Sequence, residues 1–267
     1  MVVSNDVPPA TPSEAEILAV LQHSHDRLVE YAAPLTPEQL TGPSYPSEWT
    51  IAQVLSHLGS GAEIFTLFLA AGAEGQEPPA FDRFQAIWDV WNARSPQNQA
   101  AAALEADAAF LSAVEALTPE QRGAWHLPIF GAEQDLAGVL RMRLGEHAVH
   151  TWDVVVALDP SATLPDDAAA LLIDGLDALV ARSGKGAEEG LRVSITTTEP
   201  VRAFSLVVDP EGAALAPGDG DGDGPSLSLP AEAFIRLVYG RLDPDHTPPL
   251  QTDGVDIDLL RRTFPGF

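Results

Sequence analysis

Ionisable residues recur on one stripe of a predicted helix in the middle of the chain. The spacing is three, four and three residues in the row Arg143, Glu146, His150 and Asp153. Residues at these intervals lie above one another on one helical face. Leucines and valines border the stripe, which favours a position inside a helical bundle. Because buried charges are costly unless they are paired or bind a metal ion, the stripe is a candidate for half of a metal site.

Glu146 and His150 are four residues apart and can point at one ion, so a third ligand must come from another helix. His57 is the candidate because it lies in an otherwise apolar row of a second predicted helix. Gly61, one turn further on, removes a side chain and leaves room beside it. Two imidazoles and one carboxylate leave coordination positions open for water or substrate, as in a catalytic metal site. Zinc is the first choice, and nickel, iron(II) and manganese are alternatives.

The histidines of the chain allow alternative assignments. A histidine on an apolar helix face is often a hydrogen-bonded core residue, so His57 could have that role without a metal. His147 is a rival ligand because it lies three residues before His150. It is about 100° around the helix from Glu146, which favours a place beside the site. His23 and His25 are two residues apart and face different sides, so a shared site there is not expected.

Composition limits the partners that this chain can have. The 267 residues include 14 Lys and Arg against 39 Asp and Glu, a formal net charge of −25. Such a charge repels phosphate backbones and anionic lipids, so we expect neither a nucleic-acid partner nor a membrane partner. We find no apolar run of the ~20 residues that a membrane helix needs and no secretory signal at the N-terminus. A cytoplasmic protein is therefore expected.

The chain contains no cysteine. This excludes disulfides, thiolate metal ligands and a cysteine nucleophile. Any thiol chemistry would need a thiol from outside the chain.

The pattern of apolar residues predicts an N-terminal all-α four-helix bundle followed by a small α+β domain. Ser13 and Glu16 have the spacing of a capping box, and Ser95 precedes a proline at a helix start. The four long helices are expected over residues 13–33, 50–71, 95–117 and 133–158, with a short helix before residue 95. Further helices are expected over 168–182, 231–242 and 255–264, and strands over 191–198, 203–209 and 226–230. The two domains are placed at residues 1–162 and 163–267.

Two segments of the sequence resemble a known family. PSEWTIAQVLSHLGSGAEIF (residues 46–65) and GEHAVHTWDVVVALDP (residues 145–160) resemble the mycothiol-dependent maleylpyruvate isomerase family of the DinB/YfiT-like metalloenzyme superfamily. The resemblance extends over nearly the whole chain. It implies that the helical bundle is DinB-like and that the C-terminal domain is sterol-carrier-like, with residues 231–245 resembling the late helix of that domain.

The resemblance also implies a set of site residues. The family binds a divalent metal, usually zinc, at positions that fall on His57, Glu146 and His150. It is also associated with an arginine of the C-terminal domain that reaches the substrate carboxylates, and this position falls on Arg241. The alternative for Arg241 is a simple ion pair with Asp243 or Asp245.

The implied reaction uses mycothiol as an external thiol cosubstrate. A metal ion would hold the thiol as a thiolate at neutral pH, and the thiolate would add to a small electrophile. Arg241 would orient an anionic substrate, and Arg143 or Asp153 could tune the metal ligands. The outcome would be isomerisation or S-transfer. Two alternatives stay open: a metal-dependent hydrolase that uses zinc-bound water, and a non-enzymatic protein that binds a small ligand.

Overall fold

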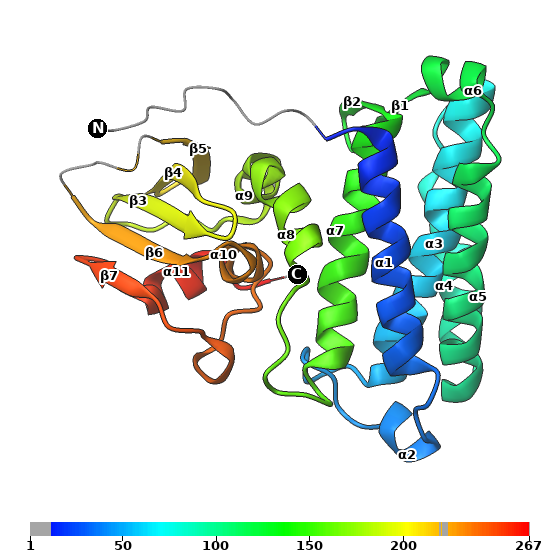
Figure 1. Ribbon diagram of the computed structural model, residues 1–267, viewed down its shortest axis with the longest axis horizontal. Coiled ribbons are helices and arrows are strands. Elements are labelled where there is room, and N and C mark those ends of the chain that lie inside the picture. Colours follow the sequence, from blue (N-terminus) through cyan, green and yellow to red (C-terminus); the bar gives the residue numbers. More distant parts are fainter. Residues whose placement is uncertain (1–11, 219, 221–223, 267) are drawn as a thin grey trace.

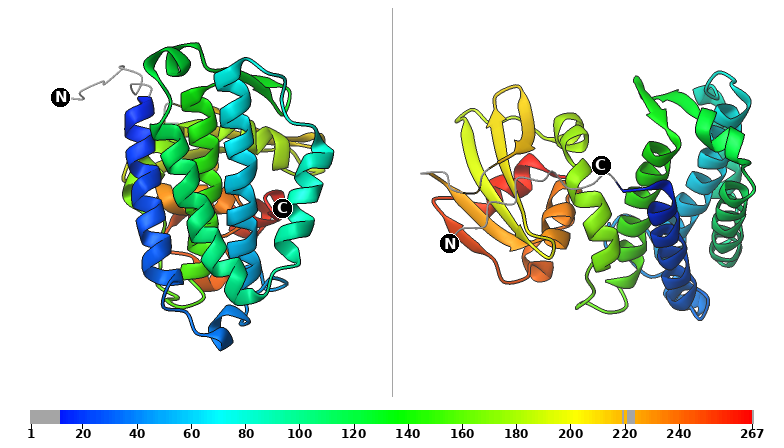
Figure 2. Two further views of the ribbon diagram at one scale, coloured as in Figure 1. Left: turned by 90° about the vertical axis from the view of Figure 1, so that its right-hand side faces the viewer. Right: turned by 45° about the horizontal axis from the view of Figure 1, so that its top comes forward.

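Four long helices lie side by side at one end of the molecule (Figures 1 and 2). The computed structural model describes residues 12–218, 220 and 224–266, so residues 1–11, where no secretory signal is expected, lie outside the described residues. The long helices are α1 (Glu14–Ala32), α3 (Ile51–Glu74), α5 (Pro96–Glu115) and α7 (Leu136–Val155). α1 contacts α5 and α7, and α3 contacts the same two helices. The short helices α2 (Pro37–Leu40), α4 (Phe81–Asn92) and α6 (Pro119–Ala124) connect them.

Side-chain caps explain where three of the long helices begin. Ser13 and Glu16 form the predicted capping box at the start of α1. Thr50 forms another with Gln53 at the start of α3. Ser95 caps α5, with a proline in its first turn. Each cap satisfies backbone N–H groups that have no partner inside the helix. The sequence predicted these helix starts to within one residue.

The helix α7 begins three residues later than expected, and a short hairpin precedes it. Strands β1 (His126–Ile129) and β2 (Ala132–Asp135) pair antiparallel. Phe130 and Gly131 have φ angles of 51° and 84°, which are suited to a two-residue hairpin turn. The predicted start at residue 133 was wrong because residues 132–135 form the second strand of the hairpin. The Asp135 carboxylate then accepts a hydrogen bond from the Gly138 amide at 2.7 Å and caps α7.

The C-terminal part is built on a five-stranded sheet. Its order is β5-β4-β3-β6-β7, in which only the β3–β6 pair is parallel. The strands are β3 (Leu191–Thr198), β4 (Arg202–Asp209), β5 (Gly212–Pro217), β6 (Ser226–Pro230) and β7 (Gln251–Asp253). The sequence predicted β3, β4 and β6, but it missed β5 and β7.

Helices fill the space between this sheet and the long helices (Figure 1). They are α8 (Asp166–Leu172), the short 3₁₀ helix η1 (Ile173–Gly175), α9 (Asp177–Ser183) and α10 (Ala231–Val238). The predicted single helix over 168–182 was wrong, because the chain breaks into three pieces around Gly175, a residue with poor helix propensity. All eight residues of α10 are buried. The remaining elements are η2 (Pro244–His246) and α11 (Ile257–Thr263).

One apolar cluster continues from the long helices into the sheet and its helices. The C-terminal sheet-containing domain is therefore docked firmly on α7 and α1, through α8. The domain boundary at residues 162 and 163 falls in the connection between α7 and α8, and it stays a prediction.

The helix α3 has the length and composition of a membrane span. The mean hydropathy of its most apolar window is 1.4, so the expectation of no such segment was wrong by this measure. However, 67% of that window is buried inside the structure. Its apolar residues are thus used in the protein core, where α3 packs against α4, α5 and α7.

Candidate metal centre

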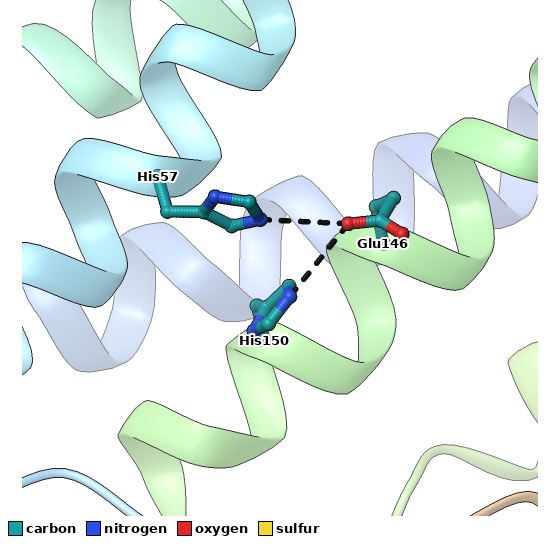
Figure 3. Close-up of side chains that lie close together, drawn as sticks. All are labelled: His57, Glu146 and His150. Carbon is teal, nitrogen blue, oxygen red and sulfur yellow. Dashed lines mark hydrogen bonds and ion pairs between the residues drawn. The ribbon is translucent and has the colours of Figure 1, made fainter. Parts of the chain in front are cut away.

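The three predicted ligands meet between two of the long helices. His57 comes from α3, and Glu146 and His150 come from α7 (Figure 3). One ligand atom of each residue lies within 4.8 Å of the other two. The Glu146 Oε2 atom is 3.5 Å from His57 Nε2 and 3.6 Å from His150 Nε2. The three side chains are partly buried, so solvent can reach this cluster.

The electrostatics of the cluster favour the protonation states that bind metal. Burial lowers the pKa of His57 below its usual value, which keeps the imidazole neutral near pH 7. Burial alone would raise the pKa of Glu146. The hydrogen bond with His57 and the electrostatic interactions with His150, His57 and Arg143 outweigh this effect and lower the pKa to about 2. A neutral imidazole and an ionised carboxylate are the forms that coordinate a cation.

A buried aspartate holds the far side of the His150 ring. The Asp153 Oδ2 atom lies 2.8 Å from His150 Nδ1, and the side chain of Asp153 is fully buried. Burial would raise the pKa of Asp153, but its contacts with His150 and Arg241 outweigh this and lower it. A carboxylate that orients a metal-binding histidine in this way is a recurring feature of metal sites.

Arg241 also lies at this aspartate. Its Nε and Nη2 atoms donate to the Asp153 carboxylate at 3.2 and 3.1 Å, and Nη1 donates to the Tyr239 carbonyl at 2.6 Å. Among the described residues, its ion pair is thus with Asp153 and not with Asp243 or Asp245, the alternative partners considered from the sequence. A role of Arg241 toward a substrate carboxylate stays a prediction.

A second network lies deeper between the helices, and the sequence did not predict it. Its centre is Asp107 of α5, which is 2% exposed. The Arg143 Nη2 atom donates to Asp107 Oδ1 at 2.8 Å, and His25 Nδ1 lies 2.7 Å from Oδ2. Contact with the neighbouring histidines and Arg143 lowers the pKa of Asp107, against the opposing effect of burial. An acid on the apolar face of α5 was the one available signal.

His147 belongs to this deeper network, whereas the helix geometry predicted only that it lies off the ligand stripe, beside the site. Its side chain is fully buried, and its Nδ1 atom lies 2.7 Å from Ser24 Oγ. The Nε2 atom lies 2.9 Å from Asp107 Oδ2, but away from the hydrogen-bonding direction. A Cβ atom at Gly61 would lie 3.1 Å from Arg143 Nη1. Among the described residues this is the one contact found within 4 Å of such a Cβ atom, so the glycine makes room for Arg143, and the room expected beside His57 stays a prediction.

A pocket of about 460 Å³ opens next to His57. It lies where α3, α4 and α5 meet, and no motif of the sequence predicted it. Its lining is rich in amides and indoles: Trp49, Gln53, Ser60, Gln85, Trp88, Asp89, Asn92 and Gln99. The ring of Trp49 packs edge-on against His57, with 5.6 Å between the ring centroids. Of the three candidate ligands, His57 alone lines this pocket, so a small molecule there would reach the candidate metal centre at His57.

Comparison with known proteins identifies the family. Residues 21–155 match the profile of the mycothiol maleylpyruvate isomerase N-terminal domain, which is about half of the chain. The chain therefore belongs to the mycothiol maleylpyruvate isomerase family. A search of curated protein sequences finds no significant match.

Solved structures share the fold. The crystal structure of the mycothiol-dependent maleylpyruvate isomerase superposes with a TM-score of 0.66 at 13% identity, covering 94% of this chain and 95% of that chain. A histidine-to-alanine mutant of that enzyme gives a TM-score of 0.65 at 14% identity, covering 90% and 92% of the two chains. YfiT from Bacillus subtilis, described as a probable metal-dependent hydrolase, has 17% identity and a TM-score of only 0.41. Its match covers 57% of this chain and 93% of that one.

Proposed function

We propose that this protein is a divalent-metal-dependent enzyme that uses a low-molecular-weight thiol, mycothiol, on a small electrophilic and anionic substrate. The reaction is an isomerisation or an S-transfer of the maleylpyruvate isomerase type. The observation that carries the proposal is the convergence of His57, Glu146 and His150 beside a pocket. Membership of the mycothiol maleylpyruvate isomerase family supports the choice of thiol and reaction.

The donor set fits a zinc ion. His57, Glu146 and His150 would hold it, since two imidazoles and a carboxylate with an open position are typical of catalytic zinc sites. When bound there, zinc would lower the pKa of a coordinated thiol and so supply a thiolate at neutral pH. The protein has no cysteine of its own, and this is consistent with a thiol that comes from outside.

The residues of the chain prepare the site for this chemistry. The lowered pKa values of His57 and Glu146 keep protons from competing for the ligand atoms near pH 7. The Asp153 carboxylate accepts a hydrogen bond from His150 Nδ1–H, which leaves the lone pair of His150 on Nε2, the atom nearest Glu146. The pocket beside His57 offers indole faces and amide groups to a small molecule. A substrate carboxylate could engage Arg241 only if the arginine released Asp153.

We further propose that the long helices form a DinB-like four-helix bundle and that the C-terminal domain is sterol-carrier-like. The mutual contacts of α1, α3, α5 and α7 support the first assignment. The packing of α10 against β3 and β6 is the feature that supports the second. The cytoplasmic location stays a prediction.

Metal analysis combined with a thiol-consumption assay tests the proposed function. Purified protein is expected to hold about one zinc per chain and to turn over maleylpyruvate only when mycothiol is present. His57→Ala should lose the metal and the activity, whereas His23→Ala, which changes an exposed histidine, should keep both.

The negative outcomes of these assays distinguish the two alternative functions. Metal-loaded protein that hydrolyses esters without a thiol would support the hydrolase alternative. Protein that binds no divalent metal after exposure to zinc would contradict both enzymatic alternatives and leave the small-ligand binding protein.

A further inference from the structure

The turn that follows α10 contacts α7 on both sides of the two ligands that α7 carries. A Cβ atom at Gly145, just before Glu146, would lie 2.6 Å from the hydroxyl oxygen of Tyr239. Three residues beyond His150, Asp153 forms its ion pair with Arg241. The C-terminal domain thus reaches the ligand-bearing segment of α7 at two places.

The backbone of this turn is built to present Arg241 to α7. Gly240 has a φ angle of 73°, and a Cβ atom there would lie 2.3 Å from the backbone nitrogen of Gly266. Only glycine meets both conditions without strain. The Arg241 amide donates to the Arg236 carbonyl at 2.6 Å, as in a glycine-terminated helix end. The Arg236 guanidinium donates back to the Arg241 carbonyl at 3.2 Å, so the turn is held from both sides.

The Arg241 guanidinium is fully engaged in this position. Two of its nitrogens form a fork on the Asp153 carboxylate, and the third donates to a carbonyl of its own turn. Its side chain is 8% exposed, and the side chain of Asp153 is not exposed at all. Paired donors of this kind fix a carboxylate in orientation as well as in position.

The same aspartate determines the orientation of His150. Asp153 Oδ2 accepts from Arg241 Nη2 at 3.1 Å and lies 2.8 Å from His150 Nδ1. Since an ionised carboxylate can only accept hydrogen bonds, Nδ1 carries the proton and Nε2 keeps its lone pair. The Nε2 atom is the one that lies 3.6 Å from Glu146 Oε2, inside the ligand cluster.

We propose that Arg241 is a positioning residue of the metal centre. It holds Asp153, and through Asp153 it fixes the His150 ring with Nε2 among the ligand atoms. The C-terminal domain thereby sets the metal affinity of ligands that all lie on α3 and α7. This inference rests on the proposed metal function. It gives Arg241 the role of positioning a metal ligand instead of binding the substrate.

Zinc affinity of full-length variants tests the inference. Dissociation constants are measured by competition with a chromophoric zinc chelator for the wild type, Arg241→Gln, Arg241→Lys and Arg202→Gln. Arg241→Gln should bind zinc roughly 10- to 100-fold more weakly, the usual effect of losing a residue that supports a ligand. Arg241→Lys should recover part of this loss because its ammonium keeps the charge. Arg202→Gln is the control, since Arg202 pairs with Asp174 of η1.

A double variant separates this role from a general loss of structure. If Arg241 acts through Asp153, then Asp153→Asn combined with Arg241→Gln should bind zinc no more weakly than Asp153→Asn alone. Independent, additive losses would overturn the inference. So would an Arg241→Gln protein that binds zinc as the wild type does but shows a raised KM for an anionic substrate.

A proton NMR measurement on the metal-free protein keeps the inference testable without zinc. The Nδ1–H of His150, hydrogen-bonded to Asp153, should give a slowly exchanging downfield resonance in the wild type and in Arg202→Gln. Arg241→Gln should lose or broaden it. If the wild type binds no zinc, the proposed function fails, while this resonance still decides whether Arg241 positions the ring. An unchanged resonance in Arg241→Gln would contradict the inference.

Discussion

Two buried aspartates organise the two polar regions between the long helices, and they make nearly the same contacts. Asp107 of α5 binds the guanidinium of Arg143 and the ring of His25. Asp153 of α7 binds the guanidinium of Arg241 and the ring of His150. Both carboxylates are almost completely removed from solvent. In both regions a buried carboxylate is balanced by one arginine and by imidazole.

The two regions differ in what lies around their histidine rings. The Nε2 atom of His150 faces Glu146 and lies near His57, which together form the ligand group found among the described residues. Around Asp107, the second imidazole is that of His147, which is enclosed and bonded to Ser24. Residue types alone therefore do not distinguish a structural network from a metal centre. The metal centre is distinguished by the further ligand atoms that converge on His150 where solvent can reach them.

The largest effect is expected from removing the charge of Asp107. Asp107→Asn leaves the Arg143 guanidinium, which is 1% exposed, without its counter-charge. Breaking a buried pair in this way costs about 3–5 kcal/mol, to be measured by urea unfolding. Glu105→Gln, an exposed change on the same helix, should cost little. If Asp107→Asn lowers the free energy of unfolding by less than about 1 kcal/mol, the scale of surface pairs, then the Asp107 network does not stabilise the fold as proposed.

Next in size is the effect of Asp153→Asn on metal binding. The amide cannot replace the carboxylate as acceptor for both His150 and Arg241, so zinc affinity should fall about 10- to 100-fold. This corresponds to about 1.4–2.7 kcal/mol of binding free energy. Chelator competition measures it. In the folded fraction of Asp107→Asn the zinc affinity should stay unchanged, and equal losses in both variants would remove the distinction between the two regions.

A smaller, pH-dependent effect is expected at His25. Its hydrogen bond to Asp107 raises its pKa above the ordinary 6.5, against the opposing effect of burial. The folded protein therefore holds this proton to a higher pH than the unfolded chain does. The resulting stability is complete below about pH 6.5 and is lost as the pH rises through the raised pKa.

Substitution reveals this contribution. His25→Gln should cost about 1 kcal/mol more near pH 5.5 than near pH 8.5, the net contribution of a typical hydrogen bond in a folded protein. Unfolding curves for both proteins at the two pH values measure the difference. A larger cost at the higher pH would mean that His25 is neutral in the folded protein.

The smallest effect is expected at the surface pair of Arg202 with Asp174. The two side chains are 27% and 34% exposed, so Arg202→Gln should cost at most about 1 kcal/mol. Thermal unfolding and zinc titration together check this. A large loss of either stability or zinc affinity would show that solvent exposure does not separate this pair from the buried ones.

The sequence contained enough to predict the metal centre because its ligands follow local rules. Glu146 and His150 are one turn apart, and Asp153 lies on the same stripe, so helix periodicity alone aligned them. His57 required the further observation of a histidine in an apolar row, together with the family resemblance. Their roles as metal ligands stay predictions, although their proximity is a property of the structure.

The Asp107 network could not be predicted in the same way. Its members come from α1, α5 and α7, and no spacing within one segment relates Asp107 to His25 or Arg143. Similar limits apply to the fold. The long helices and three strands carry strong periodicity, whereas β7 has three exposed residues and β5 is rich in alanine and glycine. The break at Gly175 had a local signal, but apolar periodicity on both sides outweighed it.

The central claim is that His57, Glu146 and His150 bind one metal ion. A crystal structure of the zinc-loaded protein, with diffraction data collected on both sides of the zinc absorption edge, tests it most directly. We expect one anomalous peak at about 2.0–2.2 Å from His57 Nε2, His150 Nε2 and a Glu146 carboxylate oxygen. Zinc bound only elsewhere, for example at His23 and Asp167, with no peak between α3 and α7, would contradict it.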